Sequence, residues 1–428
     1  MSLRRRTTPT RTTCELLLAA MGLATFVGAA RGDPWPAWRG PTGQGICFES
    51  NLPVRWSPTE HVKWKVPLPG PGNSTPIVWG DRVFLTQAWD AGKNRSLFCM
   101  DRRDGAVLWK RTVSYPETEW SEGRSPTPYA SASPVTDGER VIAFYDEPLL
   151  VCYDFQGREL WRRKPGAHRN EWNAASPVLW GNLCFVNCGP SENTFLLALD
   201  KRTGRTVWKV DLPFTNARIP GRGETFTASW STPLVAEWNG RADLVVPLPY
   251  HVYGFDPTTG TERWRCGGLG AMVYPSPLAA DGVVVAMAGN TGSGIAARLG
   301  GNGDVTETHR LWKAPRAQNR ISSGVIAGKY LYLVGGPGIA ECVELRTGRR
   351  VWRERLVRRA CWSSLVLADK KLYVLDSGAV CIVFAASPTF KLFARNRLDE
   401  MTGASIAVSD GELFIRTHEH LWCISAAK

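Results

Sequence analysis

The side chains best spaced for metal binding are two histidines near the C-terminus. His418 and His420 flank Glu419, so on a β-strand both imidazoles would share one face while the carboxylate points the other way. Imidazoles on one face can bind zinc, but a structural site needs about four ligands, and the neighbouring sequence offers no third. The pattern favours ordinary residues of a surface hairpin, and we expect no metal site.

Other stretches resemble functional loops without having their context. GNTGSG (289–294) lies between β-rich runs, whereas a phosphate-binding loop opens a helix. GNGDVTET (301–308) is similar to a calcium-binding turn but occurs once, so we interpret it as a structural turn. The six histidines are scattered, and no Ser-His-Asp or Cys-His combination is evident. The sequence predicts no catalytic residue.

Two recurring phrases indicate which elements must position any site. The first is a short apolar strand, a turn that usually contains glycine, and a tryptophan, as in CMDRRDGAVLW, CYDFQGRELW, ALDKRTGRTVW, GFDPTTGTERW and CVELRTGRRVW. The second is a hydroxyl residue, a β-branched run, a tight turn and another β-rich run; it begins at Ser74, Ser133, Ser176, Ser231, Ser276, Ser323, Ser363 and Ser405. Pairs such as Asp-Gly and Gly-Asn suit two-residue hairpins. Regular repetition of this kind indicates a repeat architecture.

One unit is therefore a four-stranded antiparallel sheet of roughly 40 to 58 residues, the size of a propeller blade. Eight copies predict an all-β, eight-bladed β-propeller. The last copy lacks its fourth strand, and HVKWKVPL (61–68) precedes the first copy, so we expect this N-terminal strand to complete the last blade. The repeated indoles should pack between consecutive blades: Trp64, Trp109, Trp161, Trp208, Trp264, Trp312 and Trp352.

The loops that lead into each innermost strand should surround a central funnel. The candidate ligand-binding residues there are Asn73, Tyr129, Asn173, Trp230, Tyr274, Arg320, Trp362 and Thr402, with Glu171, Glu224, Arg359 and Glu400 close by. Aromatic, amide and charged groups of this kind suit a ligand site; a solvated channel mouth is the alternative. Two long linkers, 110–130 and 209–229, are the segments that we expect to contact partners.

Five cysteines appear to share one repeat position, two residues before the end of the third strand: Cys99, Cys152, Cys342, Cys381 and Cys423. Equivalent positions in different blades lie too far apart for a disulfide, so we expect small packing residues. Cys184 and Cys188 would lie about 13 Å apart on an extended strand and pair only if the chain turns back. The sequence leaves the pairing of Cys47, Cys266 and Cys361 open.

The first 30 residues have the layout of a secretory signal peptide. Arginines precede an apolar run that ends in Gly28-Ala29-Ala30, which predicts cleavage after Ala30, with an uncleaved anchor as the alternative. Cys14 precedes this run and is misplaced for lipid attachment. We divide the chain into a signal peptide (1–30), an extension (31–60) and the propeller (61–428). The net charge of +13 is interpreted as a basic solvated surface. Export argues against nucleic acid, and no later segment is predicted to span a membrane.

The tryptophan phrase is similar to the docking motif of quinoprotein-type, eight-bladed propellers over about residues 60–428. DPWPAWRGPTGQG (33–45), GNGDVTETHRLW (301–312) and RTHEHLWCI (416–424) resemble exported bacterial PQQ-like repeat proteins. Two families of known role share the motif. PQQ-dependent alcohol dehydrogenases hold the quinone in the axial funnel with a calcium ion, a catalytic aspartate and commonly a disulfide between adjacent cysteines. The lipoprotein of the barrel-assembly machinery instead recruits partners through its loops.

The chain lacks the marks of the first family and part of the second. It has no adjacent cysteines and no aspartate that matches the catalytic one, and its only leader cysteine is misplaced for a lipid. We therefore expect an exported, monomeric, non-enzymatic propeller of the periplasm or cell envelope, without a cofactor, that binds a protein, glycan or small ligand at its loop face or central funnel. The alternative is a PQQ-dependent alcohol or sugar dehydrogenase that uses PQQ with calcium.

Overall fold

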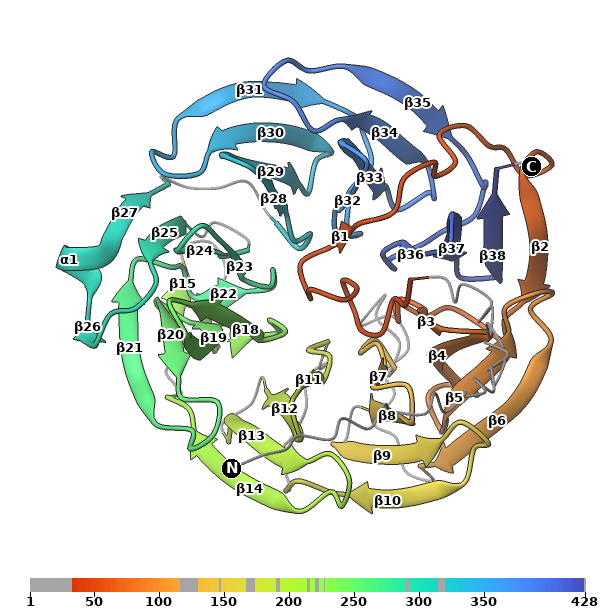
Figure 1. Ribbon diagram of the computed structural model, residues 1–428, viewed down its shortest axis with the longest axis horizontal. Helices are drawn as coiled ribbons and strands as arrows, with labels where there is room; N and C mark the ends of the chain where they lie inside the picture. The colour runs from red at the N-terminus through yellow and green to blue at the C-terminus, as the bar shows by residue number, and fades with distance from the viewer. Residues whose placement is uncertain are drawn as a thin grey trace, which may run out of the picture. The chain divides into compact units, whose positions relative to one another are not determined.

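The computed structural model describes residues 33–115, 130–145, 148–166, 174–189, 193–213, 216–219, 223–226, 228–289, 293–314 and 320–426. Within them, eight blade sheets surround a central channel (Figure 1). The predicted eight-bladed β-propeller is confirmed. In every blade the first strand of the unit, strand A, lies innermost, and strands B, C and D follow outward.

The strands of blades 1 to 4 are, from A to D, β3 (Ile77–Trp79), β4 (Arg82–Trp89), β5 (Asn94–Asp101) and β6 (Val107–Ser114); β7 (Val135–Thr136), β8 (Arg140–Tyr145), β9 (Leu149–Asp154) and β10 (Glu159–Arg163); β11 (Val178–Trp180), β12 (Leu183–Cys188), β13 (Phe195–Asp200) and β14 (Thr206–Asp211); β18 (Leu234–Trp238), β19 (Arg241–Leu248), β20 (His251–Phe255) and β21 (Glu262–Gly267).

The strands of blades 5 to 8 are, in the same order, β23 (Leu278–Ala280), β24 (Val283–Met287), β25 (Gly294–Arg298) and β27 (Arg310–Lys313); β28 (Val325–Ala327), β29 (Tyr330–Gly335), β30 (Ile339–Glu344) and β31 (Arg350–Arg355); β32 (Val366–Ala368), β33 (Lys371–Leu375), β34 (Cys381–Ala385) and β35 (Leu392–Asn396); β36 (Ala407–Ser409), β37 (Glu412–Arg416), β38 (His420–Ser425) and β2 (Val62–Pro67).

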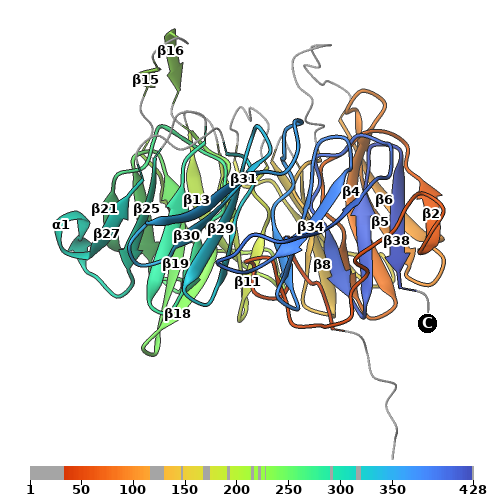
Figure 2. The ribbon, with the colours of Figure 1, turned by 90° about the horizontal axis from the view of Figure 1, so that it is seen from above.

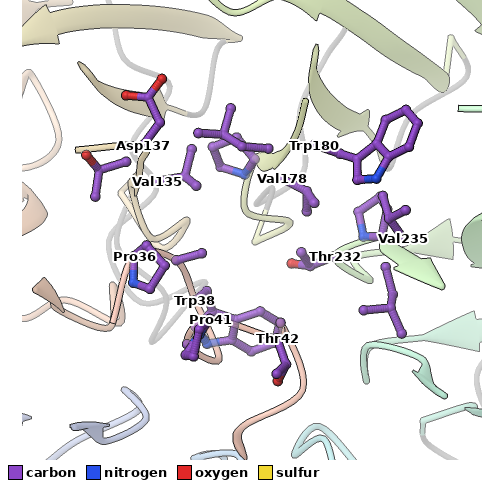
Figure 3. Close-up of a pocket in the computed structure, with 18 of the residues that line it drawn as sticks. Pro36, Trp38, Pro41, Thr42, Val135, Asp137, Val178, Trp180, Thr232 and Val235 are labelled. Carbon is purple, nitrogen blue, oxygen red and sulfur yellow. The ribbon is translucent and has the colours of Figure 1, made fainter. Parts of the chain in front are cut away.

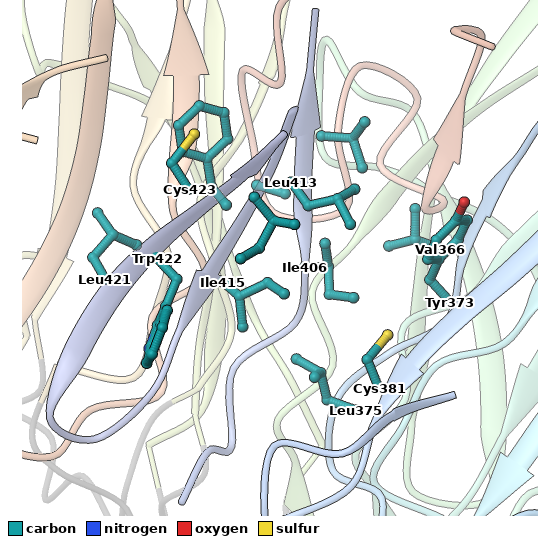
Figure 4. Close-up of a cluster of buried hydrophobic side chains, with 14 of the residues drawn as sticks. Val366, Tyr373, Leu375, Cys381, Ile406, Leu413, Ile415, Leu421, Trp422 and Cys423 are labelled. Atoms are coloured by element: carbon teal, nitrogen blue, oxygen red, sulfur yellow. The ribbon is translucent and has the colours of Figure 1, made fainter. Parts of the chain in front are cut away.

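The N-terminal strand closes the ring as the sequence predicts. Strand β2 pairs antiparallel with β38, with Trp64 opposite Cys423. Buried apolar side chains of blades 7 and 8 form one continuous cluster beside this junction (Figure 4), which includes Tyr373, Ile415 and Trp422. Because both ends of the propeller share one sheet, the ring has no open blade edge.

The repeated tryptophan docks onto the turn between strands C and D of the next blade. Trp64 Nε1 donates to Arg102 O at 2.8 Å, and a Cβ added to Gly105 would lie 2.9 Å from the Trp64 ring. Glycine is therefore required in this turn, both for its positive φ of 76° and for the close approach of the ring. The same donation is made by Trp109, Trp161, Trp208, Trp312 and Trp352 to Phe155, Lys201, Pro257, Leu345 and Ser387.

Two junctions between blades depart from this pattern. In blade 7 the position of the tryptophan is occupied by Ala394, and Trp56 from the N-terminal extension joins the buried cluster beside it, with its amide bonded to Asn396 Oδ1 at 3.0 Å. In blade 4, Trp264 Nε1 donates to Asp243 Oδ2 of its own blade at 2.9 Å. GNGDVTET explains the second case: it forms β26 (Gly303–Asp304), which pairs parallel with β21, and the helical turn α1 (Thr306–His309).

The small residue on strand C faces the tryptophan on strand D. The facing pairs include Cys99 with Trp109, Cys152 with Trp161, Cys342 with Trp352, Ala198 with Trp208, and Gly254 with Trp264. The prediction that Cys381 belongs to this set is wrong. Cys381 faces Asn396, and the equivalent residue is Val383, which faces Ala394; a small residue is not needed where the indole is absent.

A ring of hydroxyl groups joins the inner ends of the blades. The amide of Thr75 in blade 1 donates to Ser133 Oγ in blade 2 at 2.9 Å, and the amide of Ser133 donates to Ser176 Oγ at 3.0 Å. Five further bonds of this kind continue the ring: Ser176 to Thr232, Ser276 to Ser323, Ser323 to Ser364, Ser364 to Ser405, and Ser405 to Thr75. The hydroxyl of Ser276 has no hydrogen-bond partner among the described residues, so the ring is interrupted between blades 4 and 5.

The extension that precedes β2 enters the central channel. Trp35 forms an antiparallel bridge with Val78 of blade 1, and β1 (Ile46–Cys47) pairs parallel with β32 of blade 7. Between them, the buried Arg39 donates to Gln44 O at 2.5 Å and to Gly324 O of blade 6. Burial lowers the pKa of Arg39 to about 9. In the part of the chain that the structure describes, no helix is long and apolar enough to cross a bilayer.

Candidate functional site

The central channel has two ends that differ in what they offer a ligand. At the D–A end, the loops from strand D to the next strand A and from strand B to strand C surround the opening. At the A–B end lie the turns between strands A and B, together with the N-terminal extension. Figure 2 shows the two ends on opposite sides of the ring. The funnel residues predicted from the sequence belong to the D–A end.

Two of the predicted funnel residues form an aromatic pair. The rings of Trp230 and Tyr274 are stacked, with centroids 4.7 Å apart and planes 20° from parallel. The pair is held by the backbone, because β17 (Ala228–Ser229) and β22 (Met272–Val273) run parallel and Trp230 N donates to Val273 O at 2.8 Å. Each ring therefore covers one face of the other, and both side chains are partly buried.

Arg320 is withdrawn from the funnel. Its side chain is 4% exposed and its guanidinium forms a salt bridge with Glu341 on β30. Burial lowers the pKa of Arg320, and the nearby carboxylate opposes that shift. Glu341 also lies 3.5 Å from the Arg350 guanidinium and 3.6 Å from that of Arg353. The charge of Arg320 is thus satisfied within the protein and is not free to meet an anionic ligand.

Thr402 and Asn73 lie over the junction of blades 8 and 1. Thr402 Oγ1 donates to Arg416 O at 2.7 Å, and the Asn73 side chain packs against Gly403. Arg416 is fully buried and donates to Thr86 O at 3.0 Å and to the side chain of Gln87. Burial lowers the pKa of Arg416 to about 9. Asn73 Oδ1 is buried without a partner among the described residues, so this corner is structural in most of its contacts.

Glu400 is the centre of the charged groups at the D–A end. It lies 3.0 Å from Lys65 Nζ and 2.8 Å from His420 Nδ1, and it accepts a hydrogen bond from Thr417 Oγ1. Burial of Glu400 opposes its ionisation, but the bonds from Thr417 and Lys65 and the charge of His420 outweigh burial and lower its pKa. Lys65 belongs to β2, so this network also holds the closing strand.

The expected arrangement of the two histidines is wrong. His418 precedes β38 and His420 begins it, so they do not alternate along one strand. Glu419 does not point away: its carboxylate, that of Glu400 and a nitrogen of His420 lie within 4.8 Å of one another. The Lys65 ammonium already occupies the position beside Glu400 that a metal ion would take. These contacts favour an ion-pair network.

The remaining predicted residues contribute less. Trp362 is partly buried, and the exposed Arg359 reaches the Met401 sulfur at 3.8 Å. Tyr129, Asn173 and Glu171 lie outside the described residues, and Glu224 is described by its backbone alone. The linker 209–229 contains β15 (Asn216–Ile219) and β16 (Gly223–Phe226), which pair antiparallel as a separate two-stranded sheet. Figure 2 shows this hairpin extending beyond the blades at the D–A end.

The described residues of the D–A end do not fit PQQ with calcium. Calcium takes six to eight oxygen ligands, whereas the only described cluster of acidic groups and histidines that could hold a metal ion offers two carboxylates and one nitrogen, with Lys65 bound to it. A quinone with several carboxylates needs free cationic groups, yet Arg320 is buried against Glu341. The ten described cysteines are all unpaired, and burial raises the pKa of Cys184 to about 12, so its thiol stays protonated.

The A–B end contains a cavity of about 380 Å³ that sequence reasoning missed (Figure 3). Residues 36–43 of the extension form one wall, and the inner strands β3, β7, β11 and β18 form the other. Three indoles line it, those of Trp38, Trp79 and Trp180. The signal was present in the sequence, because DPWPAWRGPTGQG has two tryptophans and three prolines, which is unlike a solvated linker.

The polar groups around this cavity are few. Asp137 Oδ2 lies 3.0 Å from Lys201 Nζ and 3.2 Å from Arg140 Nη1. Burial opposes the ionisation of Asp137, but the hydrogen bond from Lys201 and the backbone amides outweigh it, and its pKa is lowered. Trp180 Nε1 donates to Glu237 on β18 at 3.2 Å. The cavity is therefore mainly apolar, with one ion pair at its edge and room for a few side chains.

The blade number, the docked indoles and the ring closure define a PQQ-like β-propeller. Residues 93–354, more than half of the chain, match the family model described as outer membrane protein assembly factor BamB. The protein belongs to this family.

Solved structures agree on the fold. BamB from Moraxella catarrhalis superposes with a TM-score of 0.61 at 13% identity, covering 84% of this chain and 98% of that one. The quinohemoprotein alcohol dehydrogenase from Comamonas testosteroni superposes with a TM-score of 0.66 at 11% identity, covering 94% of this chain and 82% of that one. At these identities the likeness concerns the fold alone.

A curated relative is an enzyme by name. The polyvinylalcohol dehydrogenase of Sphingopyxis sp. (strain 113P3) is 24% identical over 277 residues, which make up 56% of this chain and 40% of that protein. The chain thus matches less than half the length of this relative. Similarity extends to both the assembly-factor and the dehydrogenase branches of the propeller fold.

Proposed function

We propose that the protein is an exported, non-enzymatic binding propeller that holds a protein partner in the cell envelope. The observation that carries the proposal is that the charged groups at the D–A end are already paired within the protein. Arg320 is buried against Glu341, and Glu400 is engaged by Lys65 and His420. A catalytic funnel keeps such groups available to substrate and cofactor, because they act on charge that develops during the reaction.

The β15–β16 hairpin supports partner binding at the D–A end. It forms a separate two-stranded sheet, and a lone hairpin is only marginally stable in water. Segments of this kind on a rigid scaffold commonly carry recognition. We propose that this hairpin, with the linker 110–130, contacts the partner. The family match to an assembly factor favours a protein over a glycan as that partner.

The second candidate is a quinoprotein dehydrogenase. The resemblance to a polyvinylalcohol dehydrogenase favours it, as does the stacked pair of Trp230 and Tyr274 at the D–A end. The donor set described above disfavours it, because a calcium ion and an anionic quinone would lack free ligands.

One titration separates the two candidates. Purified protein is titrated with PQQ and calcium by calorimetry, and dye-linked oxidation of ethanol, glucose and polyvinyl alcohol is then measured. We expect neither stoichiometric binding nor turnover. Saturable PQQ binding with dye reduction would overturn the proposal in favour of the dehydrogenase.

A second experiment tests the partner. A variant in which residues 214–227 are replaced by a short Gly-Ser linker is used as bait beside the intact protein in a pull-down from native envelopes. We expect an unchanged melting temperature and loss of the captured partner. Retention of every partner by the deletion variant would contradict the role of the hairpin.

A further inference from the structure

The inner strands of the propeller carry a repeated backbone amide that points into the channel. In each blade it belongs to the third residue after the hydroxyl ring, such as Val78 after Thr75 and Thr136 after Ser133. Val78 exchanges both of its backbone hydrogen bonds with Trp35, so these groups face the channel and not β4. The other members of this set, in blades 3 to 8, are Leu179, Val235, Ala279, Ile326, Leu367 and Val408.

The N-terminal extension already satisfies four of these amides. Val78 N donates to Trp35 O at 2.9 Å, and Thr136 N donates to Pro36 O at 2.9 Å. Farther along the extension, Leu367 N donates to Gly45 O at 2.8 Å, and Ala279 N donates to the Gln44 side chain at 2.7 Å. Two consecutive residues of one extended segment therefore cap two consecutive blades.

The amides of Leu179 and Val235 continue this row and line the cavity at the A–B end. Leu179 lies opposite Cys184 and Val235 lies opposite Leu244, the same register that places Val78 opposite Val83. Both amides therefore point into the channel. Within the described part of the chain, neither is bonded to another group, and an unpaired amide in an apolar cavity is a costly state that a ligand carbonyl relieves.

We infer that the cavity is a strand-addition site for an extended peptide of a partner protein, one that carries an aromatic residue followed by proline. The site continues the seam along which residues 35–45 already pair with the inner strands, so the partner extends an interface that the chain itself has established. Leu179 offers an amide and a carbonyl to the first peptide residue, as Val78 does to Trp35. Val235 needs only a carbonyl from the second.

Proline suits that second position because it has no amide to leave unpaired. Pro36 shows the same use in this chain: its carbonyl caps Thr136. The aromatic residue suits the first position because Trp180 and Trp38 provide apolar faces within the cavity. Main-chain bonds to a free strand edge supply affinity, and the pocket for the side chain supplies specificity.

This inference rests on the proposed function, since it names the chemistry of a partner, but it fails separately from it. Absence of peptide binding leaves partner capture through the β15–β16 hairpin untouched, and turnover with PQQ would overturn the proposed function while leaving peptide binding at the opposite end of the channel intact.

The probe is a fluorescein-labelled peptide that copies residues 33–40, Asp-Pro-Trp-Pro-Ala-Trp-Arg-Gly, added to the full chain and followed by fluorescence polarisation. We expect saturable binding that Leu179→Pro and Val235→Pro each weaken at least about tenfold, the effect of one lost hydrogen bond with its desolvation. Ile326→Pro is the matched control, because it removes an equivalent channel-facing amide outside the cavity. Binding that both cavity variants retain would overturn the inference, as would the absence of saturation up to about millimolar peptide, the weakest affinity that a specific site would show.

Hydrogen exchange keeps the test decisive if a proline variant does not fold. In the wild-type protein, the peptide should slow exchange at residues 178–180 and 234–236 and leave 325–327 unchanged. Slower exchange at none of these segments would overturn the inference. Faster exchange at Val78 and Thr136 would also overturn it, because the probe would then have displaced the chain's own extension.

Discussion

The junction between blades 3 and 4 and the junction between blades 4 and 5 are neighbours, yet they are built differently. At the first, Trp208 donates to Pro257 O of the next blade at 3.0 Å, and Ser176 N donates to Thr232 Oγ1 at 2.9 Å. At the second, Trp264 donates to Asp243 of its own blade, and the hydroxyl of Ser276 has no partner among the described residues. Both the outer and the inner contacts of the repeat therefore change at one place.

The difference teaches what the repeat unit requires. Trp264 has no exposed surface, whereas Trp208 is 8% exposed, because β26 pairs alongside β21 and covers the indole from outside. A Cβ on Gly254 would lie 2.2 Å from the Trp264 ring, so only glycine lets the indole approach its own sheet. The turn of blade 5 has thus exchanged docking under the indole for a strand laid over it.

The largest expected effect comes from removing an ordinary docking indole. Trp208→Ala should lower the free energy of unfolding by about 3–5 kcal/mol, because it leaves a cavity between two blades and an unpaired carbonyl on Pro257. Urea denaturation followed by circular dichroism measures this loss. An unchanged transition midpoint would contradict the placement of the indole at the junction.

A somewhat smaller effect is expected for the partner that is particular to the second junction. Asp243 is buried and also pairs with Arg241 at 2.9 Å and Arg263 at 2.8 Å. Asp243→Asn should cost about 2–3 kcal/mol, since charged hydrogen bonds are lost in a buried site. Asp211→Asn on β14, at an exposed pair, is the control and should cost less than about 0.5 kcal/mol. Equal losses in the two variants would remove the distinction between the junctions.

The hydroxyl ring gives the sharpest matched pair. Ser405→Ala should cost about 1–2 kcal/mol, because the buried amide of Ser364 loses its acceptor. Ser276→Ala should change the stability by less than about 0.5 kcal/mol, since its hydroxyl accepts no bond from a described residue. Thermal and urea unfolding of the two variants measure the difference. A cost for Ser276→Ala that equals that of Ser405→Ala would show that the ring is continuous.

The smallest expected effect concerns pH at the closing junction, where Glu400 holds Lys65 of β2. The pKa of Glu400 is lowered from its ordinary value of 4.5 in the folded protein. Its stabilising effect is therefore complete above pH 4.5 and is lost as the pH falls through the lowered value. Unfolding of the wild type and Glu400→Gln is compared at pH 7 and pH 3. The difference should be about 1 kcal/mol or less at pH 7 and should vanish at pH 3; a gap that widens on acidification would contradict the sign.

The sequence predicts the architecture well because the repeat is local. The phrases that end in tryptophan specify the strands C and D, and the copy at residues 61–68 predicts the closing strand, which β2 confirms. The drift of residues 296–312 from the consensus marks the one junction where the inner and outer contacts both change. Cys381 misleads because a cysteine fell two residues from a position whose need for a small side chain had disappeared with Ala394.

The candidate sites are less predictable because they depend on contacts between distant segments. Arg320 is placed at the funnel by its repeat position, but its pairing with Glu341 follows from strand packing that no local pattern encodes. The cavity at the A–B end requires residues 36–43 to lie across four inner strands. The prolines and tryptophans of that extension indicate burial, but their binding surface exists only once the ring has formed.

The pairing of β2 with β38 has a consequence for how the protein is made. A chain that emerges with its N-terminus first must keep β2 unsatisfied until residues 420–425 arrive, although seven blades can collapse before then. During this interval the strand presents a row of free amides and carbonyls to any neighbouring chain. Maturation therefore depends on shielding one early segment from aggregation, and a proteolytic cut that releases β2 would reopen the finished ring at the same seam.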